Sequence, residues 1–95
     1  MRKDQGKHDR AVAVQTSWFA NNGWPIVYAD LPNLAKPPKI GGFIPDVYAR
    51  HGINECVVEV ETLDSVNSDQ AKQQKLVFQQ WAMQSPARRF IQKVV

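Results

Sequence analysis

Three acidic residues stand in two segments whose other residues are typical of buried β-strands. Asp46 lies in the segment 44–49 (IPDVYA), and Glu59 and Glu61 lie in the segment 56–62 (CVVEVET). Burying a carboxylate without a partner is costly, so we expect these acids to share a cation. Because the side chains of a strand alternate, Glu59 and Glu61 share one face, and Asp46 can lie opposite Glu59 in a hairpin. Three carboxylates at neighbouring strand ends would suit Mg²⁺ or Mn²⁺ better than Zn²⁺.

Helical and strand patterns predict the elements that position these acids. A helix is expected from about Lys7 to Asn22, where the apolar residues recur at helical spacing; they are Ala11, Val14 and Trp18, with Val12 and Phe19. The remaining elements are expected as strands at about 24–29, 43–49, 55–62 and 90–95 and as a helix from Ser65 or Ser68 to Gln84. The predicted order is therefore α-β-β-β-α-β.

Two connections in this arrangement are also predicted. Residues 30–39 contain Pro32, Pro37 and Pro38, which favour an extended loop and exclude a helix. Residues 50–54 form a five-residue connection between the second and third strands, so that these two strands make a hairpin. The hairpin would place Asp46 and Glu59 on adjacent strands.

The composition limits what such a site can serve. A chain of 95 residues is one domain with a small core, so dimerisation would add to its stability. The net charge of +3 is compatible with a polyanionic partner, and the single cysteine, Cys56, excludes a disulfide framework. No apolar run is long enough for a membrane span, and the N-terminal residues 1–6 are polar. We therefore expect a cytoplasmic protein that is not inserted in a membrane.

Pro45-Asp46, followed thirteen positions later by Glu59-Val60-Glu61, resembles the signature of the PD-(D/E)XK nuclease superfamily. The predicted order of elements is similar to the core of that superfamily, from the first helix to Val95. The resemblance implies an α/β fold with a restriction endonuclease-like core, in which helices flank a mixed central sheet. Residues 1–95 would then be a single domain. More chain usually follows the last strand of this fold, so a fragment and a minimal version are both compatible with the pattern.

The resemblance also implies the roles of individual residues. Asp46 and Glu59 are expected to be metal ligands, and the backbone carbonyl of Val60 is expected to complete a site for Mg²⁺ or Mn²⁺. The chain departs from the commonest pattern at Glu61, where most members have lysine. A glutamate there can act as a general base or as another metal ligand, but it supplies no positive charge.

A cation for the site would have to come from elsewhere in the chain. Lys72 and Lys75 are favoured over the loop lysines Lys36 and Lys39, since the second helix is expected to pack near the end of the third strand. Many members also carry an acid in the first helix. Here only Asp9, which follows His8, can take that role.

The function implied by the resemblance is metal-dependent hydrolysis of DNA phosphodiester bonds, by an endonuclease or resolvase-like homodimer. The residues expected to contact nucleic acid are Lys36, Lys39, Arg50, His51, Gln70 and Gln74. An alternative is a degenerate nuclease-fold module that binds nucleic acid or a protein without cleavage, because the motif lysine is replaced by Glu61. A third possibility is a structural domain whose acids are incidental.

Overall fold

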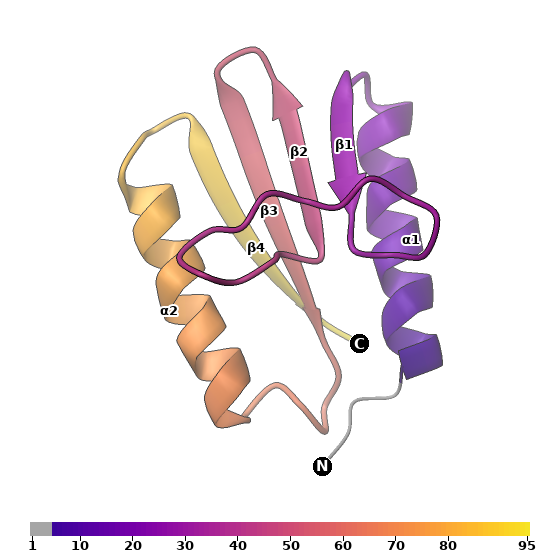
Figure 1. Ribbon diagram of the computed structural model, residues 1–95, viewed down its shortest axis with the longest axis vertical. Coiled ribbons are helices and arrows are strands. Elements are labelled where there is room, and N and C mark those ends of the chain that lie inside the picture. The colour runs from indigo at the N-terminus through magenta and orange to yellow at the C-terminus, as the bar shows by residue number, and fades with distance from the viewer. Residues whose placement is uncertain (1–4) are drawn as a thin grey trace.

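The computed structural model describes residues 5–95, and its elements follow the predicted order α-β-β-β-α-β (Figure 1). Residues 1–4, part of the N-terminal segment 1–6 considered above, lie outside this described range. The elements are α1 (Gln5–Asn21), β1 (Ile26–Ala29), β2 (Val47–His51), β3 (Asn54–Glu61), α2 (Asp69–Met83) and β4 (Arg88–Val94). No helix between residues 5 and 95 is long and apolar enough to cross a membrane.

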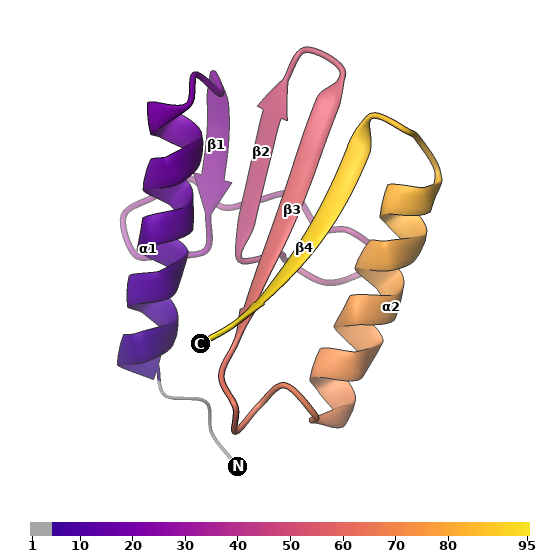
Figure 2. The ribbon, with the colours of Figure 1, turned by 180° about the vertical axis from the view of Figure 1, so that it is seen from behind.

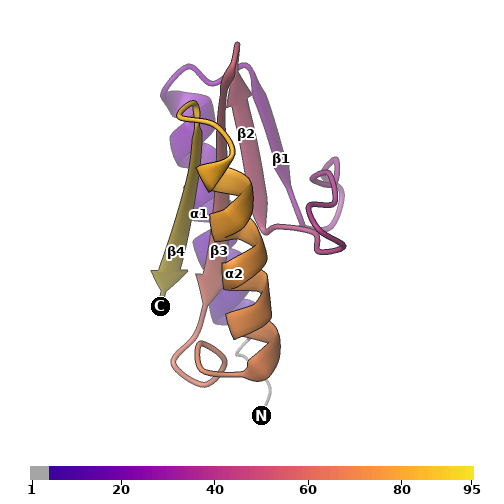
Figure 3. The ribbon, with the colours of Figure 1, turned by 90° about the vertical axis from the view of Figure 1, so that its left-hand side faces the viewer.

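The four strands form one mixed sheet in the order β1-β2-β3-β4. The first two strand pairs are antiparallel, whereas β3 and β4 are parallel and are joined through α2. The helix α1 lies on one face of the sheet and α2 on the other, as Figures 2 and 3 show from behind and from the side. The protein is therefore an α/β fold with a mixed sheet between two helices.

The core on the α1 face is formed by small and β-branched side chains. Val12 and Phe19 of α1 pack against Val47 of β2 and against Val58 and Val60 of β3. The alternation in β3 predicts this inward face, and the prediction is confirmed. Because α1 covers β1, β2 and β3, the same face of β4 is left more open.

The opposite face has an aromatic core beneath α2. Phe78 of α2 is fully buried and packs with Tyr48, Val57 and Phe90. The loop between β1 and β2 crosses the same face and adds Phe43 to this cluster. Both faces of the sheet are thus covered, and the acids of β3 lie within the fold rather than on a solvated surface.

A tight turn attaches this crossing loop to α2. Ile40 and Phe43 exchange backbone hydrogen bonds of 2.8 and 3.1 Å, with Gly41 and Gly42 between them. Both glycines have positive φ, which a two-residue type I′ turn requires. A Cβ on Gly41 would lie 2.4 Å from Cγ1 of Val77, so only glycine fits between the turn and α2.

Two predicted boundaries are wrong. β2 begins at Val47 instead of about Phe43, because Phe43 pairs with Ile40 in the turn described above and is not available to the sheet. The connection between β2 and β3 has two residues, Gly52 and Ile53, instead of five. Gly52 has a φ of +62°, which suits the first position of a two-residue hairpin loop. The pairing of β2 with β3 therefore extends as far as His51 and Asn54.

Candidate functional site

Asp46 and Glu59 lie side by side at the end of the sheet where β2 begins. Val47 pairs with Val58 in the antiparallel register. Asp46 precedes Val47 and Glu59 follows Val58, so the two acids lie opposite each other. The backbone N–H of Asp46 donates to Oε1 of Glu59 over 2.8 Å, and the N–H of Val60 donates to Oδ2 of Asp46 over 2.8 Å. Both acids are buried, with exposed fractions of 7% and 4%. The predicted juxtaposition of Asp46 and Glu59 is therefore present in the structure.

A histidine from α1 completes this acidic pair. Nε2 of His8 lies 3.2 Å from Oδ2 of Asp46, and Nδ1 of His8 lies 3.0 Å from Oδ1 of Asp9. His8 is buried, and its two ring nitrogens lie close to a carboxylate oxygen of each aspartate, so it packs against the Asp46 carboxylate from the helix side. Asp9, which the sequence favours as the acid of the first helix, reaches this site through His8.

No role of its own is expected for His8 from the sequence, although a signal for its burial exists. His8, Val12 and Phe19 are spaced by four and seven residues, so they share one face of a helix. Val12 and Phe19 form the apolar stripe of α1, and His8 extends that stripe by one turn. A polar residue in line with an apolar stripe is expected to be buried and to need a polar partner.

Glu61 is the most deeply buried of the three acids of the motif, with an exposed fraction of 2%. Oγ of Ser65 donates to Oε2 of Glu61 over 2.5 Å, and the N–H of Thr62 donates to Oγ of Ser65 over 3.1 Å. The turn that follows β3 thus folds back on the last acid of the strand. Ser65 is a contact of Glu61 that the sequence alone does not indicate.

The donor set at this end of the sheet has a definite chemistry. Asp46 and Glu59 provide carboxylate oxygens, which Mg²⁺ and Mn²⁺ prefer. Within residues 5–95, no three side chains of His, Cys, Asp or Glu are grouped so that they could hold a metal ion. Mg²⁺ is commonly held by one or two protein carboxylates together with water and substrate phosphate oxygens. The two carboxylates fit an ion whose other ligands are water and substrate oxygens. They do not fit a site in which the protein supplies every ligand.

The lysines expected to serve the site are on the surface. Lys72 and Lys75 are exposed on α2, and neither forms an ion pair with a described residue. Their helix packs mainly on β4, the edge strand beyond β3. In the crossing loop, Nζ of Lys36 lies 3.0 Å from Oδ1 of Asp30, and Lys39 is exposed. Asp46 is therefore contacted by His8 and not by these four lysines.

The remaining residues expected to bind nucleic acid lie in separate places. Gln70 is exposed and Gln74 half-buried on α2. Arg50 and His51 lie at the hairpin end of β2, opposite the end that holds Asp46 (Figure 1). Since Arg50 is four residues from Asp46, roughly 13 Å of strand separates the two. The structure thus keeps Arg50 and His51 apart from the acidic pair.

A second polar network joins β3 to β4 away from the acidic pair. The hydroxyl of Tyr48 donates to Oε2 of Glu55 over 2.6 Å, and Nε of Arg88 donates to Oε1 over 3.1 Å. The guanidinium of Arg88 also lies over the Trp81 ring, 4.7 Å from its centre. Burial and the hydrogen bond to Glu55 raise the pKa of Tyr48 to about 12. The short contact and the stacking of Arg88 indicate a structural clamp between the sheet and α2.

No protein-family model matches this chain, and no curated protein or solved structure matches it either.

Proposed function

We propose that this chain is a metal-dependent, nuclease-fold protein that hydrolyses DNA phosphodiester bonds, with Asp46 and Glu59 as the ligands of Mg²⁺ or Mn²⁺. One observation carries the proposal. The two acids are thirteen positions apart in the sequence, yet they lie side by side on adjacent strands and are linked by a hydrogen bond. Two buried carboxylates at one end of a sheet suit a divalent ion better than they suit a purely structural role.

The arrangement of the elements supports the same proposal. The order α-β-β-β-α-β and the mixed sheet between two helices agree with the core that the PD-(D/E)XK resemblance implies. A fold by itself does not imply a function, so this agreement adds weight only together with the acidic pair. We infer a restriction endonuclease-like core on these two grounds.

Phosphodiester hydrolysis at this site would require residues that hold a metal ion and keep its ligands oriented. The bound ion would make a water molecule nucleophilic and neutralise charge on the phosphoryl oxygens. Asp46 and Glu59 would hold the ion, and the backbone carbonyl of Val60 would be a further ligand. His8 and the N–H of Val60 hold the Asp46 carboxylate in one orientation, which reduces the rearrangement needed on binding. His8 is thus proposed as a positioning residue.

The roles of the other site residues follow from their surroundings. Glu61 is proposed as the general base, oriented by its hydrogen bond from Ser65. Its other expected role, as a further metal ligand, is not retained, because within residues 5–95 no three side chains of His, Cys, Asp or Glu are grouped around one position. Lys72 and Lys75 are exposed and without ion pairs in the described part of the chain, so either can approach a phosphate group. We propose that the active form is a homodimer, because cutting both strands of a duplex or junction requires two sites.

A second candidate function is a nuclease-fold module that binds nucleic acid or a protein without cleaving it. The specific observation in its favour is Glu61, which stands where the commonest pattern has lysine and is held by Ser65. Cleavage separates the two candidates, because either one can bind metal or DNA.

The test is a cleavage assay on supercoiled, linear, single-stranded and four-way-junction DNA with Mg²⁺ or Mn²⁺. We compare the wild type with Asp46→Asn and Glu59→Gln, which keep the side-chain shape and one oxygen acceptor. Asp64→Asn, a change at an exposed acid after β3, is the matched control. We expect metal-dependent cleavage that falls at least a hundredfold in the two site variants and is unchanged in the control.

Other results have equally definite meanings. Cleavage that survives both site variants would reject Asp46 and Glu59 as the ligands. DNA or metal binding without cleavage, measured by anisotropy and calorimetry, would support the non-cleaving module. Lys72→Gln and Lys75→Gln, assayed in parallel, identify the lysine that serves the phosphate, and sedimentation velocity measures the proposed dimer.

A further inference from the structure

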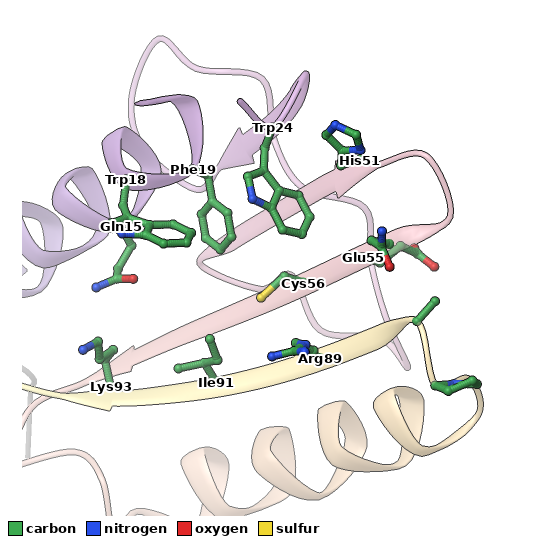
Figure 4. A pocket seen from close by; sticks show the side chains of 13 residues that line it. Gln15, Trp18, Phe19, Trp24, His51, Glu55, Cys56, Arg89, Ile91 and Lys93 are labelled. Atoms are coloured by element: carbon green, nitrogen blue, oxygen red, sulfur yellow. The ribbon is translucent and has the colours of Figure 1, made fainter. Parts of the chain in front are cut away.

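A groove of about 690 Å³ lies between α1 and β4, on the face of the sheet that α1 only partly covers. Its walls come from α1, from the hairpin end of β2 and β3, and from β4 (Figure 4). Its volume is within the range of sites that hold small molecules or single nucleotides. The acidic pair is not part of its lining, so the groove is a separate feature.

Aromatic rings form the wall of the groove on the α1 side. The ring centres of Trp18 and Phe19 are 5.1 Å apart, those of Phe19 and Trp24 are 5.2 Å apart, and those of Trp24 and His51 are 6.3 Å apart. Each pair is edge-to-face, so the four rings support one another as a continuous row. Trp18 is 53% exposed, which is unusual for tryptophan in a small domain. The row therefore offers an indole to an incoming ring.

Cationic side chains form the opposite wall. Arg89, Ile91 and Lys93 alternate along β4 and line the groove together (Figure 4). Successive members of this row are roughly 6.6 Å apart, because every second residue of a strand faces the same way. Arg89 and Lys93 are exposed, and neither forms an ion pair within residues 5–95. Glu55 also lines the groove, but its carboxylate accepts hydrogen bonds from Tyr48 and Arg88 and not from these two cations.

We propose that this groove binds a single-stranded segment of nucleic acid, with bases stacked at Trp18 and phosphates on Arg89 and Lys93. A row of aromatic rings facing a row of cations is the combination that single-strand-binding grooves use. His51, one of the residues expected from the sequence to contact nucleic acid, stands at one end of the row. The proposal rests on the proposed function only in taking DNA as the polyanion, and it requires neither the metal nor cleavage.

Charge argues against a second copy of this chain as the occupant. If two β4 strands paired antiparallel about Ile91, Arg89 of each would lie opposite Lys93 of the other, and like charges directly opposite are destabilising. An acidic peptide would satisfy the two cations, but it would make no specific use of the exposed indole. The test distinguishes a single strand of nucleic acid from an acidic peptide.

The experiment measures binding of a fluorescein-labelled oligothymidylate by anisotropy, and quenching of tryptophan fluorescence by the unlabelled strand. Both are done with EDTA present, so that the outcome is independent of the acidic pair. The variants are Trp18→Ala and the double change Arg89→Gln/Lys93→Gln. The control is Arg10→Gln, an exposed cation of α1 outside the groove lining. Circular dichroism checks that each variant is folded.

We expect Trp18→Ala to weaken binding about five- to a hundredfold and to abolish most of the quenching. The double variant should reduce the slope of log Kd against log salt concentration by about 0.7 for each phosphate group that the protein no longer neutralises. Arg10→Gln should change Kd by less than about twofold, as for a surface charge outside the site.

Three results would overturn the proposal. The first is wild-type affinity in both folded groove variants. The second is binding of a blunt-ended duplex that is as tight as that of the single strand and that the two groove variants weaken by the same factor. The third is a polyglutamate peptide of equal charge that competes as well as the oligonucleotide, which would assign the groove to acidic peptides. EDTA removes divalent ions, so the binding assay does not depend on the acidic pair. Failure of the proposed cleavage and failure of the proposed groove binding can therefore be told apart.

Discussion

The side chains of Asp46 and Glu59 each accept a hydrogen bond from a backbone N–H of the opposite segment, and these two bonds join the ends of β2 and β3. Glu59 accepts the N–H of Asp46, and Asp46 accepts the N–H of Val60, the residue after Glu59. The pair therefore closes the end of the sheet where β2 begins. The two carboxylates have a structural task as well as the proposed catalytic one, so variants must be judged on stability and on activity separately.

Replacing Asp46 by alanine removes the acceptor of a buried N–H. We expect Asp46→Ala to lower the free energy of unfolding by about 1–3 kcal/mol, the usual cost of a buried donor left without its partner. Asp64→Ala, at an exposed position, should change it by less than about 0.5 kcal/mol. Urea unfolding followed by tryptophan fluorescence measures both. Equal unfolding midpoints for Asp46→Ala and the wild type would contradict the assigned hydrogen bond.

Gly41 should tolerate no side chain, because of its neighbour Val77. Gly41→Ala places a Cβ 2.4 Å from Cγ1 of Val77 and also forces alanine to a φ of +58°. Gly42→Ala brings only the backbone strain, of about 1–2 kcal/mol, because no atom lies within 4 Å of its Cβ. We expect Gly41→Ala to be the more destabilising variant in thermal unfolding.

A second substitution separates the clash with Val77 from the strain. In the Gly41→Ala/Val77→Ala double variant the clash is absent, so its loss of stability should be smaller than the sum of the two single losses. Additive losses would show that the turn moves away from α2 instead of pressing on it.

The stability of the fold should depend on pH through Glu55. Burial opposes ionisation of this carboxyl, but hydrogen bonds from Tyr48 and Arg88 outweigh it and hold its pKa below the ordinary value of 4.5. The folded state therefore gains stability above pH 4.5, where an unfolded glutamate is ionised too, and loses that gain as pH falls through the lower folded pKa.

Glu55→Gln tests this dependence. We expect the variant to lose about 1 kcal/mol at neutral pH and to show a smaller fall in melting temperature between pH 5 and pH 3 than the wild type. Thermal unfolding by circular dichroism at several pH values measures both effects. An identical pH profile for variant and wild type would exclude Glu55 as the residue responsible.

Cys56 should be slow to react with thiol reagents in the folded protein. Burial raises its pKa from 9.0 to about 11, so the thiolate fraction near pH 8 is about a hundredfold lower than in the unfolded chain. We expect a disulfide reagent to react at least a hundredfold more slowly in buffer than in urea. Cys56→Ser provides the blank, and similar rates in both conditions would indicate that β3 opens readily.

Local patterns in the sequence account for most of the architecture. Apolar spacing in α1 and α2 and the alternation of apolar residues in β3 predict the elements and their order, because a helix and a strand each impose their own period. The opposition of Asp46 and Glu59 is also predictable, since a hairpin between two adjacent segments leaves few registers.

The partners of these acids depend on how α1 packs on the sheet and on the turn that follows β3. His8 meets Asp46, and Ser65 meets Glu61, only because α1 packs on the sheet and the turn after β3 folds back. The position of β2 was missed for the same kind of reason, since Phe43 pairs with Ile40 in a turn that rests on Val77. The helical spacing of His8 indicates that it is buried but does not identify its partner, and the turns at Ser65 and Phe43 leave no periodic signal.

The element order, the inward face of β3 and the acidic pair can be predicted from the amino-acid pattern, since they follow from short-range geometry and from the cost of burying charge. Three other features depend on how the elements pack: His8 lies against Asp46, Lys72 and Lys75 stay at the surface, and the rings beside Trp18 face Arg89 and Lys93 across one groove. The groove forms because α1 leaves the edge strand β4 uncovered, and that depends on how α1 packs across the assembled sheet.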